Sequence, residues 1–392
     1  MHRLVLLLLT LAAIASDPRL ATPAELRVTS SDELAAALRQ PAPGTTILVA
    51  PGKYRGGLSA SKLAGNREQP IVIAGSDPKN PPLIEGGPSG LHLSSPAHVE
   101  LRDLVFVGAS GNGINIDDSG STDTPAHHVV LRRIAVRDVG PRGNRDGIKL
   151  SGLRDFQIQS CRVERWGSGG SAIDMVGCAS GVVNDCTFAE AGGEMANGVQ
   201  TKGGSSDIVI QRCRFENAGG RAVNAGGSTG SDYFRPRDAT YEARDITVED
   251  CQFIGGASAI AFVGVDGALV RHNTIYRPRR WAIRILQENN DPRLVASRNG
   301  QFRNNVVAFR VGELRNVVNI GANTAPQTFT FADNVWCCLD RPADTRRLVE
   351  LPVAESGGQY DVNLDFADPD RGDLRITGNP LDAGVRPPAA SQ

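Results

Sequence analysis

The sequence contains few aromatic residues, few methionines and almost no surplus charge. Only 5% of its 392 residues are Phe, Trp or Tyr, three are Met, and the formal net charge is −1. Such a balanced charge gives no general attraction to nucleic acid or to an anionic membrane, so neither is expected as a partner. The 44 glycines fit many tight turns between short strands and, with so few aromatic and Met side chains, argue against a helical solenoid.

Long apolar runs are absent after the first residues. The basic start Met1-His2-Arg3 and the mainly apolar run 4–14, with Ala13 and Ala15 as an A-x-A-like cleavage point, predict a signal peptide at 1–15. This run is too short to cross a bilayer as a helix, and no later run is long enough, so no transmembrane segment is expected. We therefore expect a secreted or periplasmic protein, and we expect it to be a monomer.

A short apolar–polar–apolar triplet recurs through most of the chain. The tightest spacings between its copies are 23 to 26 residues, and the wider spacings contain Gly- and Asp-rich insertions. A repeat of this period is typical of a solenoid, here one built from short strands. The copies are Leu91-His92-Leu93, Ile114-Asn115-Ile116, Ile148-Lys149-Leu150, Ile173-Asp174-Met175, Val199-Gln200-Thr201, Val223-Asn224-Ala225, Ile260-Ala261-Phe262, Ile283-Arg284-Ile285 and Val318-Asn319-Ile320.

A second motif alternates with the triplet and repeats one turn position. In chain order this position is Ile134, Cys161, Cys186, Cys213, Cys251, Asn273, Asn305 and Asn334. Rungs of a parallel β-coil are about 4.8 Å apart, which is wider than the Cβ separation of about 3.8 Å that a disulfide prefers. We therefore expect these four cysteines to form a reduced, buried ladder that hydrogen-bonded amides continue. The state of Cys337 and Cys338 stays open, and the absence of any C-x-x-C pair argues against structural zinc.

One domain, residues 16–392, is expected after the signal peptide. Ser30-Ser31-Asp32-Glu33 before Leu34–Leu38 indicates a capped short helix, which would cover the first rung and block an exposed sheet edge. We assign an N-terminal cap at about 27–55, the coil at about 56–345 and a C-terminal cover at about 346–392.

Strand alternation turns the middle residue of each triplet outward, so the outward residues of successive rungs form a column. Charged and amide residues gather on the central rungs of this column, and insertions at 117–126, 227–245 and 287–300 leave the coil beside it. Loops that rise beside a polar strand face form a groove, and we predict the functional site there. The candidate residues are Asp146, Lys149, Asp174, Glu194, Asn197, Gln200, Lys202, Arg221, Asn224, Tyr233 and Arg284. The plain alternative is a solvated surface with ion pairs of little energetic consequence.

The N-terminal part of the chain carries a family resemblance. Ser31-Asp32-Glu33-Leu34, Pro43-Gly44-Thr45-Thr46-Ile47, Pro51-Gly52-Lys53-Tyr54 and Pro70-Ile71-Val72-Ile73-Ala74-Gly75 resemble the opening of secreted right-handed parallel β-helix proteins. The pattern is especially similar to polysaccharide lyases of the chondroitinase B and alginate lyase type. This resemblance implies an all-β, single-stranded right-handed parallel β-helix and an anionic polysaccharide as substrate.

The resemblance also implies roles for particular residues. Lys202 in Gln200-Thr201-Lys202-Gly203-Gly204 resembles the catalytic Lys, and Arg221 falls about one rung later, where such lyases place an Arg. Calcium is the cofactor that the resemblance suggests. Its ligands would include Asn197, which stands where a Glu is expected, and Glu194.

β-Elimination from a uronate abstracts the weakly acidic proton next to the carboxylate, so a cation must neutralise that carboxylate. Lys202 would be the base and Arg221 the clamp on the carboxylate, while Lys149, Gln200 and Asn224 would help to bind the sugar. Two alternatives stay open. One is a glycoside hydrolase that uses Asp146 and Asp174 as its two carboxylates, and the other is a non-catalytic glycan-binding or surface β-helix protein.

Overall fold

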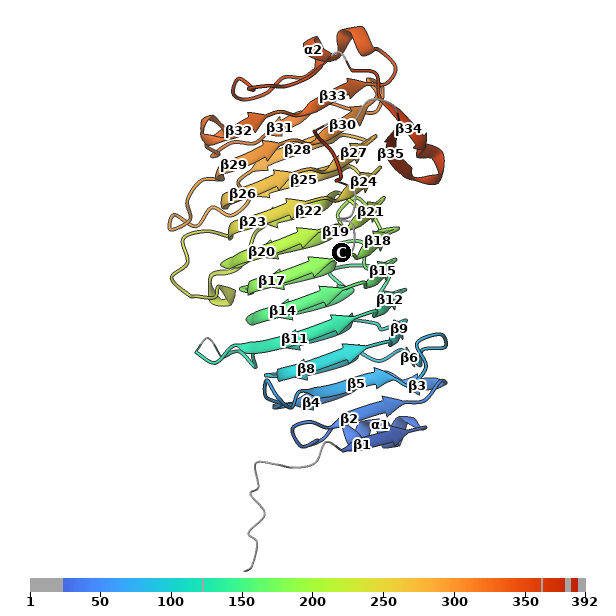
Figure 1. The fold of residues 1–392 in the computed structure, drawn as a ribbon. Helices are drawn as coiled ribbons and strands as arrows, with labels where there is room; N and C mark the ends of the chain where they lie inside the picture. Colours follow the sequence, from blue (N-terminus) through green and yellow to red (C-terminus); the bar gives the residue numbers. More distant parts are fainter. Residues whose placement is uncertain (1–23, 122, 361, 378–381, 387–392) are drawn as a thin grey trace, which may run out of the picture.

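The computed structural model describes residues 24–121, 123–360, 362–377 and 382–386, so the predicted signal peptide lies outside the described residues. Within them, three parallel sheets run along an elongated coil (Figure 1). Each full turn of the coil adds one strand to each sheet. The prediction of an all-β right-handed parallel β-helix is confirmed. No helix in the described ranges is long and apolar enough to span a membrane.

Sheet A has 12 strands, and its strands precede those of sheet B within each rung. They are β1 (Glu25–Val28), β2 (Thr46–Val49), β5 (Ile71–Gly75), β8 (Ala97–Arg102), β11 (Ala126–Arg132), β14 (Leu153–Gln159), β17 (Ala179–Asn184), β20 (Ser205–Gln211), β23 (Ala243–Glu249), β26 (Val265–Arg271), β29 (Arg298–Arg303) and β32 (Thr330–Ala332).

Sheet B has 11 mostly three-residue strands. They are β3 (Lys53–Arg55), β6 (Leu83–Glu85), β9 (Val105–Val107), β12 (Ala135–Arg137), β15 (Arg162–Glu164), β18 (Thr187–Ala189), β21 (Arg214–Glu216), β24 (Gln252–Ile254), β27 (Thr274–Tyr276), β30 (Val306–Phe309) and β33 (Val335–Cys338).

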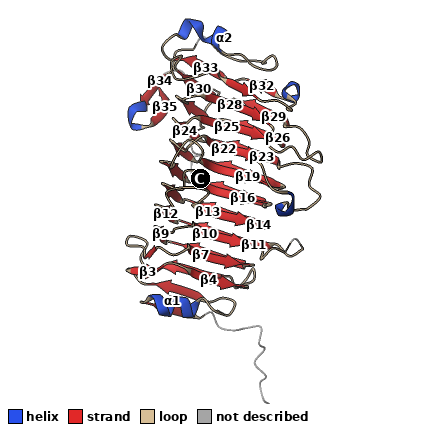
Figure 2. Ribbon diagram, turned by 180° about the vertical axis from the view of Figure 1, so that it is seen from behind, coloured by secondary structure: helices blue, strands red, loops and turns tan. Residues whose placement is uncertain are grey.

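Sheet C has 10 strands and contains the repeated triplet; Figure 2 shows most of its strands stacked along the coil. They are β4 (Leu58–Ser61), β7 (Ser89–Ser94), β10 (Asn112–Asp117), β13 (Ile148–Ser151), β16 (Ser171–Val176), β19 (Asn197–Lys202), β22 (Arg221–Gly226), β25 (Ser258–Val263), β28 (Trp281–Leu286) and β31 (Val318–Ile320).

The strand register confirms the predicted column of middle residues in sheet C. The paired residues of neighbouring strands are His92 with Asn115, Asn115 with Lys149, Lys149 with Asp174, Asp174 with Gln200, Gln200 with Asn224, Asn224 with Ala261, Ala261 with Arg284, and Arg284 with Asn319. The flanking apolar residues of the triplets, such as Ile173 and Ile260, are buried in the core between the sheets. A one-residue slip would exchange the two faces, so this alternation fixes the register.

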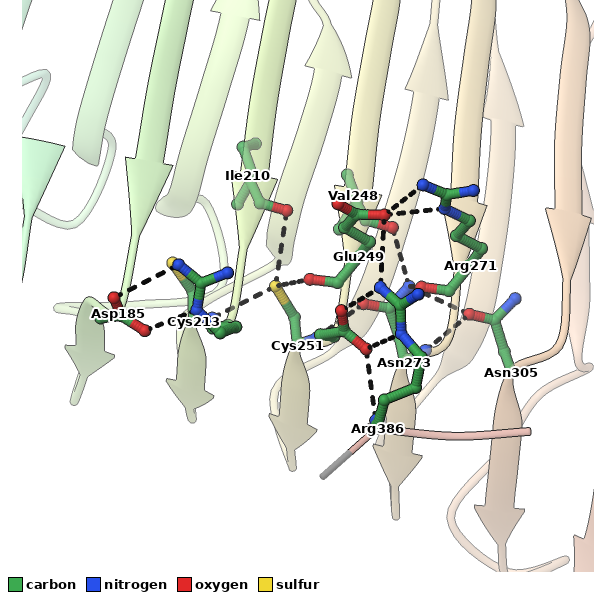
Figure 3. Close-up of polar contacts among 12 residues, drawn as sticks. Asp185, Ile210, Cys213, Val248, Glu249, Cys251, Arg271, Asn273, Asn305 and Arg386 are labelled. Carbon is green, nitrogen blue, oxygen red and sulfur yellow. Dashed lines mark hydrogen bonds and ion pairs between the residues drawn. The ribbon is translucent and has the colours of Figure 1, made fainter. Parts of the chain in front are cut away.

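A cysteine–asparagine ladder runs through the turns between sheets A and B (Figure 3). All seven cysteines are buried free thiols, which confirms the expected reduced ladder and gives the same state for Cys337 and Cys338. The backbone N–H of Cys213 donates to Cys251 Sγ at 3.4 Å, and that of Cys251 donates to Asn273 Oδ1 at 2.9 Å. The amide part continues with Asn273 N–H to Asn305 Oδ1 at 3.0 Å. Each turn therefore satisfies a buried backbone donor of the preceding turn.

Short elements cover both ends of the coil. The predicted N-terminal helix is α1 (Ser31–Ala37), where Ser30 accepts from the Glu33 N–H and Glu33 accepts from the Thr29 N–H, as in a capping box. After β33 come the helix α2 (Thr345–Leu348) and the antiparallel pair β34 (Asp365–Asp368) and β35 (Asp373–Thr377). The 3-10 turns are η1 (Ser231–Tyr233), η2 (Pro326–Thr328), η3 (Pro342–Asp344) and η4 (Pro369–Arg371).

The last described residues, 382–386, return to the side of the coil. Arg386 forms an ion pair with Asp250 in the turn between β23 and β24 (Figure 3), and the Gly384 N–H donates to the Asn304 carbonyl at 2.9 Å. These contacts hold a sequence-distant segment against the cysteine–asparagine ladder.

Candidate functional site

Four charged residues meet on β13, β16 and β19 and in the turn before β13. We call Asp146, Lys149, Asp174 and Lys202 the lysine–aspartate cluster. Lys149 Nζ forms an ion pair with Asp174 Oδ2 and lies 3.8 Å from Asp146 Oδ2, while Lys202 Nζ lies 3.2 Å from Asp174 Oδ1. The strand register of sheet C brings these side chains together. Lys149 on β13 pairs with Asp174 on β16, and Lys202 lies on the next strand, β19, opposite Val176. Asp174 is thus held between two ammonium groups.

Burial sets the electrostatics of this cluster. The Asp174 side chain is 1% exposed, and Asp146 is also buried. Burial and, second, the neighbouring Asp174 carboxylate raise the pKa of Asp146 to about 6. Burial also opposes the charge of Lys149, but Asp174 and Asp146 outweigh it and raise the pKa of this ammonium. The pKa of the Asp146 carboxyl therefore lies within reach of neutral pH.

A row of amides continues the column beyond the cluster. Gln200 Oε1 accepts from Ser171 Oγ at 3.2 Å and from Asn197 Nδ2 at 3.3 Å. Asn224 is fully buried, and its Nδ2 has no hydrogen-bond partner among the described residues. An unpaired buried donor costs free energy unless a ligand or water satisfies it. Asn224 Nδ2 is therefore a buried amide donor that no described residue satisfies.

The arginines of the site differ in how they are neutralised. Arg221 forms an ion pair with Glu288, with Nη1 3.1 Å from Oε2, and Nη1 also donates to Asn224 Oδ1 at 3.4 Å. Arg284 has no acidic partner within 4 Å in the described part of the chain, and its guanidinium carbon lies 4.1 Å from the ring centre of Trp281. Burial and, second, the Arg221 charge lower the pKa of Arg284 to about 10. Arg284 is consequently the one arginine of this site that forms no ion pair among the described residues, although the Glu288 charge partly offsets the decrease in its pKa.

The outward face of the central rungs is covered rather than solvated. Asp174, Gln200, Asn224 and Ala261 are all buried, although each points away from the core of the coil. Figure 1 shows the insertion between β22 and β23 running back beside β20 and β17. Gly227, at the start of this insertion, lies so close to the face of sheet C that a β-carbon there would be 2.6 Å from Gln200 Nε2. The expected groove is therefore partly filled by its own loops.

Two buried acids, Asp118 and Glu242, hold these loops, and neither is among the predicted site residues. Arg235 of the insertion forms an ion pair with Asp118, and its Nη2 lies 2.8 Å from Asp118 Oδ1. The Glu242 carboxylate accepts from the Thr229 N–H at 2.8 Å, from the Gly203 N–H at 2.9 Å and from Asn289 Nδ2 at 2.6 Å. Their only signal in the sequence is position, because Asp118 begins one insertion and Glu242 ends another.

The residues suggested for calcium are occupied otherwise. The Glu194 carboxylate pairs with Arg280 at 2.6 Å, and Asn197 donates to Gln200. Glu194 belongs to no group of three His, Cys, Asp or Glu side chains with converging ligand atoms in the described ranges. Calcium takes six to eight oxygen ligands, which this donor set does not supply, so the residues present do not fit the ion.

Tyr233 lies in η1 and is 65% exposed, and its side chain forms no hydrogen bond with the lysine–aspartate cluster in the described part of the chain. A separate shallow cavity of about 360 Å³ lies beside the 287–297 insertion and is lined by Gln287, Asn289, Asn290, Asp291 and other residues. None of the predicted site residues lines it. The structure thus brings together the predicted residues on the sheet C strands from β13 to β28. It leaves Tyr233 apart from them, in the insertion between β22 and β23.

Comparison with known proteins agrees with the fold. Residues 89–230 match the family described as "Right handed beta helix region". No curated protein matches the chain. Among solved structures, an alginate lyase from Paenibacillus sp. str. FPU-7 is 16% identical, with a TM-score of 0.51 over 79% of this chain and 99% of that one.

Two further solved structures have the same architecture. The pectate lyase Pel9A is 14% identical, with a TM-score of 0.54 over 95% of this chain and 94% of its own. The GH136 lacto-N-biosidase from Eubacterium ramulus is 12% identical, with a TM-score of 0.53 over 79% and 67%. At such low identity these similarities establish architecture. The chain has a right-handed parallel β-helix fold that is shared with these two lyases and this biosidase.

Proposed function

We propose that this protein is an exported carbohydrate-active enzyme that cleaves a uronate-containing polysaccharide by β-elimination on the face of sheet C. The observation that carries the proposal is the lysine–aspartate cluster, which lies in register with the amides of Gln200 and Asn224. Two of the similar structures are described as lyases, one of alginate and one of pectate, and both of those polymers are acidic.

In the proposed reaction Lys202 accepts the proton on the carbon next to the uronate carboxylate, a carbon–carbon double bond forms there, and the glycosidic carbon–oxygen bond breaks. The leaving oxygen takes up a proton from water. Two ammonium groups share Asp174, so the loss of one proton from Lys202 leaves Asp174 paired with Lys149. A base must be deprotonated before it acts, and this arrangement keeps the remaining carboxylate neutralised when that happens. Lys202 thus carries the proton, while the ammonium group of Lys149 neutralises the Asp174 carboxylate.

The arginines would neutralise the substrate carboxylate as negative charge builds on it. Arg284 lacks an acidic partner in the described part of the chain, whereas Arg221 shares its charge with Glu288. We therefore assign the first contact with the carboxylate to Arg284 and a clamping role to Arg221. No metal takes part in this scheme.

Hydrolysis is the second candidate, because one carboxylate of the pair has a raised pKa. Glycosidases use one protonated and one ionised carboxyl group, and Asp146, with a pKa of about 6, next to Asp174 matches that pattern. It ranks second because both carboxyl groups are buried and Asp174 is already held by two lysines. A non-catalytic glycan-binding protein is the remaining alternative.

The test is to incubate the protein with alginate, pectate, chondroitin sulfate and dermatan sulfate, with and without calcium. Ultraviolet absorbance of unsaturated product is expected with at least one of them. Lys202→Ala should lower kcat by about 10²-fold or more, the usual contribution of a proton-transfer group. Lys79→Ala, at an exposed lysine, is the matched control and should leave the rate unchanged.

Arg284→Ala should mainly raise KM if this residue makes the first contact with the carboxylate. Flat absorbance on every uronate polymer would contradict β-elimination, and full activity of Lys202→Ala would refute Lys202 as its base. New reducing ends without absorbance would favour hydrolysis, and retention on an immobilised glycan without turnover would favour a binding protein.

A further inference from the structure

Three of the six histidines of the sequence converge on the outside of sheet A. They are His98 on β8 and His127 and His128 on β11, and one ring nitrogen from each lies within 4.8 Å of the other two. The rings of His98 and His128 are stacked with centroids 4.4 Å apart, and the His127 ring stands edge-on to both, at 5.3 and 5.0 Å. His127 Nδ1 lies 2.9 Å from His128 Nδ1.

The backbone accounts for part of this arrangement. His98 and His128 occupy equivalent positions on neighbouring strands, both in the left-handed conformation, with φ of 51° and 54°. The same position on later strands of sheet A is Asp155, Ser180, Asp207, Asp245, Gly267 and Asn299, all with positive φ. Such residues tolerate this conformation, and histidine is enriched there too.

The backbone does not account for the third histidine. His127 is not among the residues with positive φ, yet its ring nitrogen also turns toward the other two. The three imidazoles lie on adjacent rungs and are partly accessible to solvent, as ligands of a metal ion would be. A preference of histidine for the left-handed backbone position does not explain why the third ring joins the other two.

We propose that His98, His127 and His128 bind a divalent transition-metal ion such as zinc. Zinc–imidazole bonds of 2.0–2.1 Å in a tetrahedral site place ligand nitrogens about 3.3 Å apart, so small ring rotations complete the site. Because the His128 side chain is exposed, a water molecule fills the fourth position. Imidazole suits zinc, nickel and copper, whereas calcium and magnesium require oxygen ligands. The ion would join β8 and β11 beside the 118–125 insertion.

The test uses the full chain without a polyhistidine tag, stripped with a chelator and then titrated with zinc against a competing indicator. One zinc ion per chain is expected. His98→Asn and His128→Asn keep a residue that accepts the left-handed backbone, as Asn299 does in the same column. Each variant should weaken binding by at least about tenfold, the loss that even an indirect partner of a metal ligand can cause.

His272→Asn is the matched control, because His272 also has a positive φ but lies outside the cluster. It should bind zinc like the unmodified protein, and circular dichroism should be the same for all variants. X-ray absorption of the loaded protein should give nitrogen and oxygen neighbours only.

Absence of stoichiometric binding of zinc, nickel and copper would overturn the proposal. So would unchanged binding in folded His98→Asn and His128→Asn proteins, equal loss in His272→Asn, or sulfur in the metal shell. Each readout concerns metal binding alone, so its failure would leave the proposed glycan chemistry untouched.

Discussion

The buried carboxyl group of Asp146 makes the stability of this protein depend on pH in an unusual direction. Its pKa is about 6 in the folded chain, against an ordinary value of 3.8. The folded state therefore binds this proton more tightly than the unfolded state, and the associated stabilisation is complete only below about pH 3.8. It is lost as the pH rises through 6. This is opposite in sign to the usual behaviour of an ion-paired carboxylate.

The size of this pH-dependent stabilisation follows from the two pKa values of Asp146, in the folded and in the unfolded chain. The difference between about 6 and 3.8, at about 1.36 kcal/mol per pKa unit, amounts to about 3 kcal/mol. Roughly 2 kcal/mol of this falls between pH 4.5 and 7.5, because at pH 4.5 the folded carboxyl is protonated and the unfolded one is mostly ionised. Lys149 keeps its charge throughout this range, since its pKa is raised.

Asp146→Asn removes this titration and retains an oxygen that can accept from the Ser171 N–H, as Asp146 Oδ1 does at 2.7 Å. The free energy of unfolding of the variant minus that of the unmodified protein should rise by about 2 kcal/mol from pH 4.5 to 7.5. Urea unfolding at several pH values measures it, with linear extrapolation.

Asp266→Asn is the matched control. The hydrogen bond from Arg298 lowers the pKa of Asp266, so its titration lies below this range and its difference from the unmodified protein should stay constant. A constant difference for Asp146→Asn, or one that falls as the pH rises, would refute the assignment of a raised pKa to Asp146.

Three further outcomes test the fold and the loops. A thiol reagent should label none of the seven cysteines in the native protein and all seven after unfolding without reductant; fewer than seven would indicate a disulfide. Asn305→Ala should destabilise the protein by about 3 kcal/mol in thermal or urea unfolding, because it leaves several buried ladder groups unpaired, whereas Ala at the exposed Asn290 should have little effect. Glu242→Gln should speed proteolytic cleavage within 228–241 without changing the circular dichroism of the coil, because it weakens the hydrogen bonds that hold this insertion; an unchanged cleavage rate would argue against that anchoring role.

The sequence was sufficient to predict the coil, its register and the inward ladder. Each of these depends on a repeat that places identical residue types above one another. In the turns of Cys213 and Cys251, and in those of Asn273 and Asn305, the backbone N–H of one turn donates to the side chain of the next. Period-two alternation settles which side of the strand faces inward, and this is why the middle residues from His92 to Asn319 pair strand by strand as expected.

The environment of the site could not be predicted in the same way. Arg221 pairs with Glu288, 67 positions later in the sequence, and Arg235 pairs with Asp118, 117 positions earlier. Both contacts depend on where an insertion folds back over the coil, and insertions lie outside the repeat. Strand alternation gives the direction of a side chain, but it does not tell whether a loop will cover it. For that reason the outward middle residues Asp174, Gln200 and Asn224 were expected to line a groove and are buried instead.

The burial of this face bears on its function. A β-helix needs polar outward residues only to stay solvated, and exposed ion pairs meet that need at little free-energy cost. Here Asp174 and Asp146 are removed from water beside two lysines, and for Asp146 the effect of desolvation on its pKa exceeds that of either lysine charge. The loops that bury them are in turn anchored by the buried acids Asp118 and Glu242. Well-packed apolar residues would serve stability as well as or better than such a buried cluster, so its presence favours a chemical role for the face of sheet C.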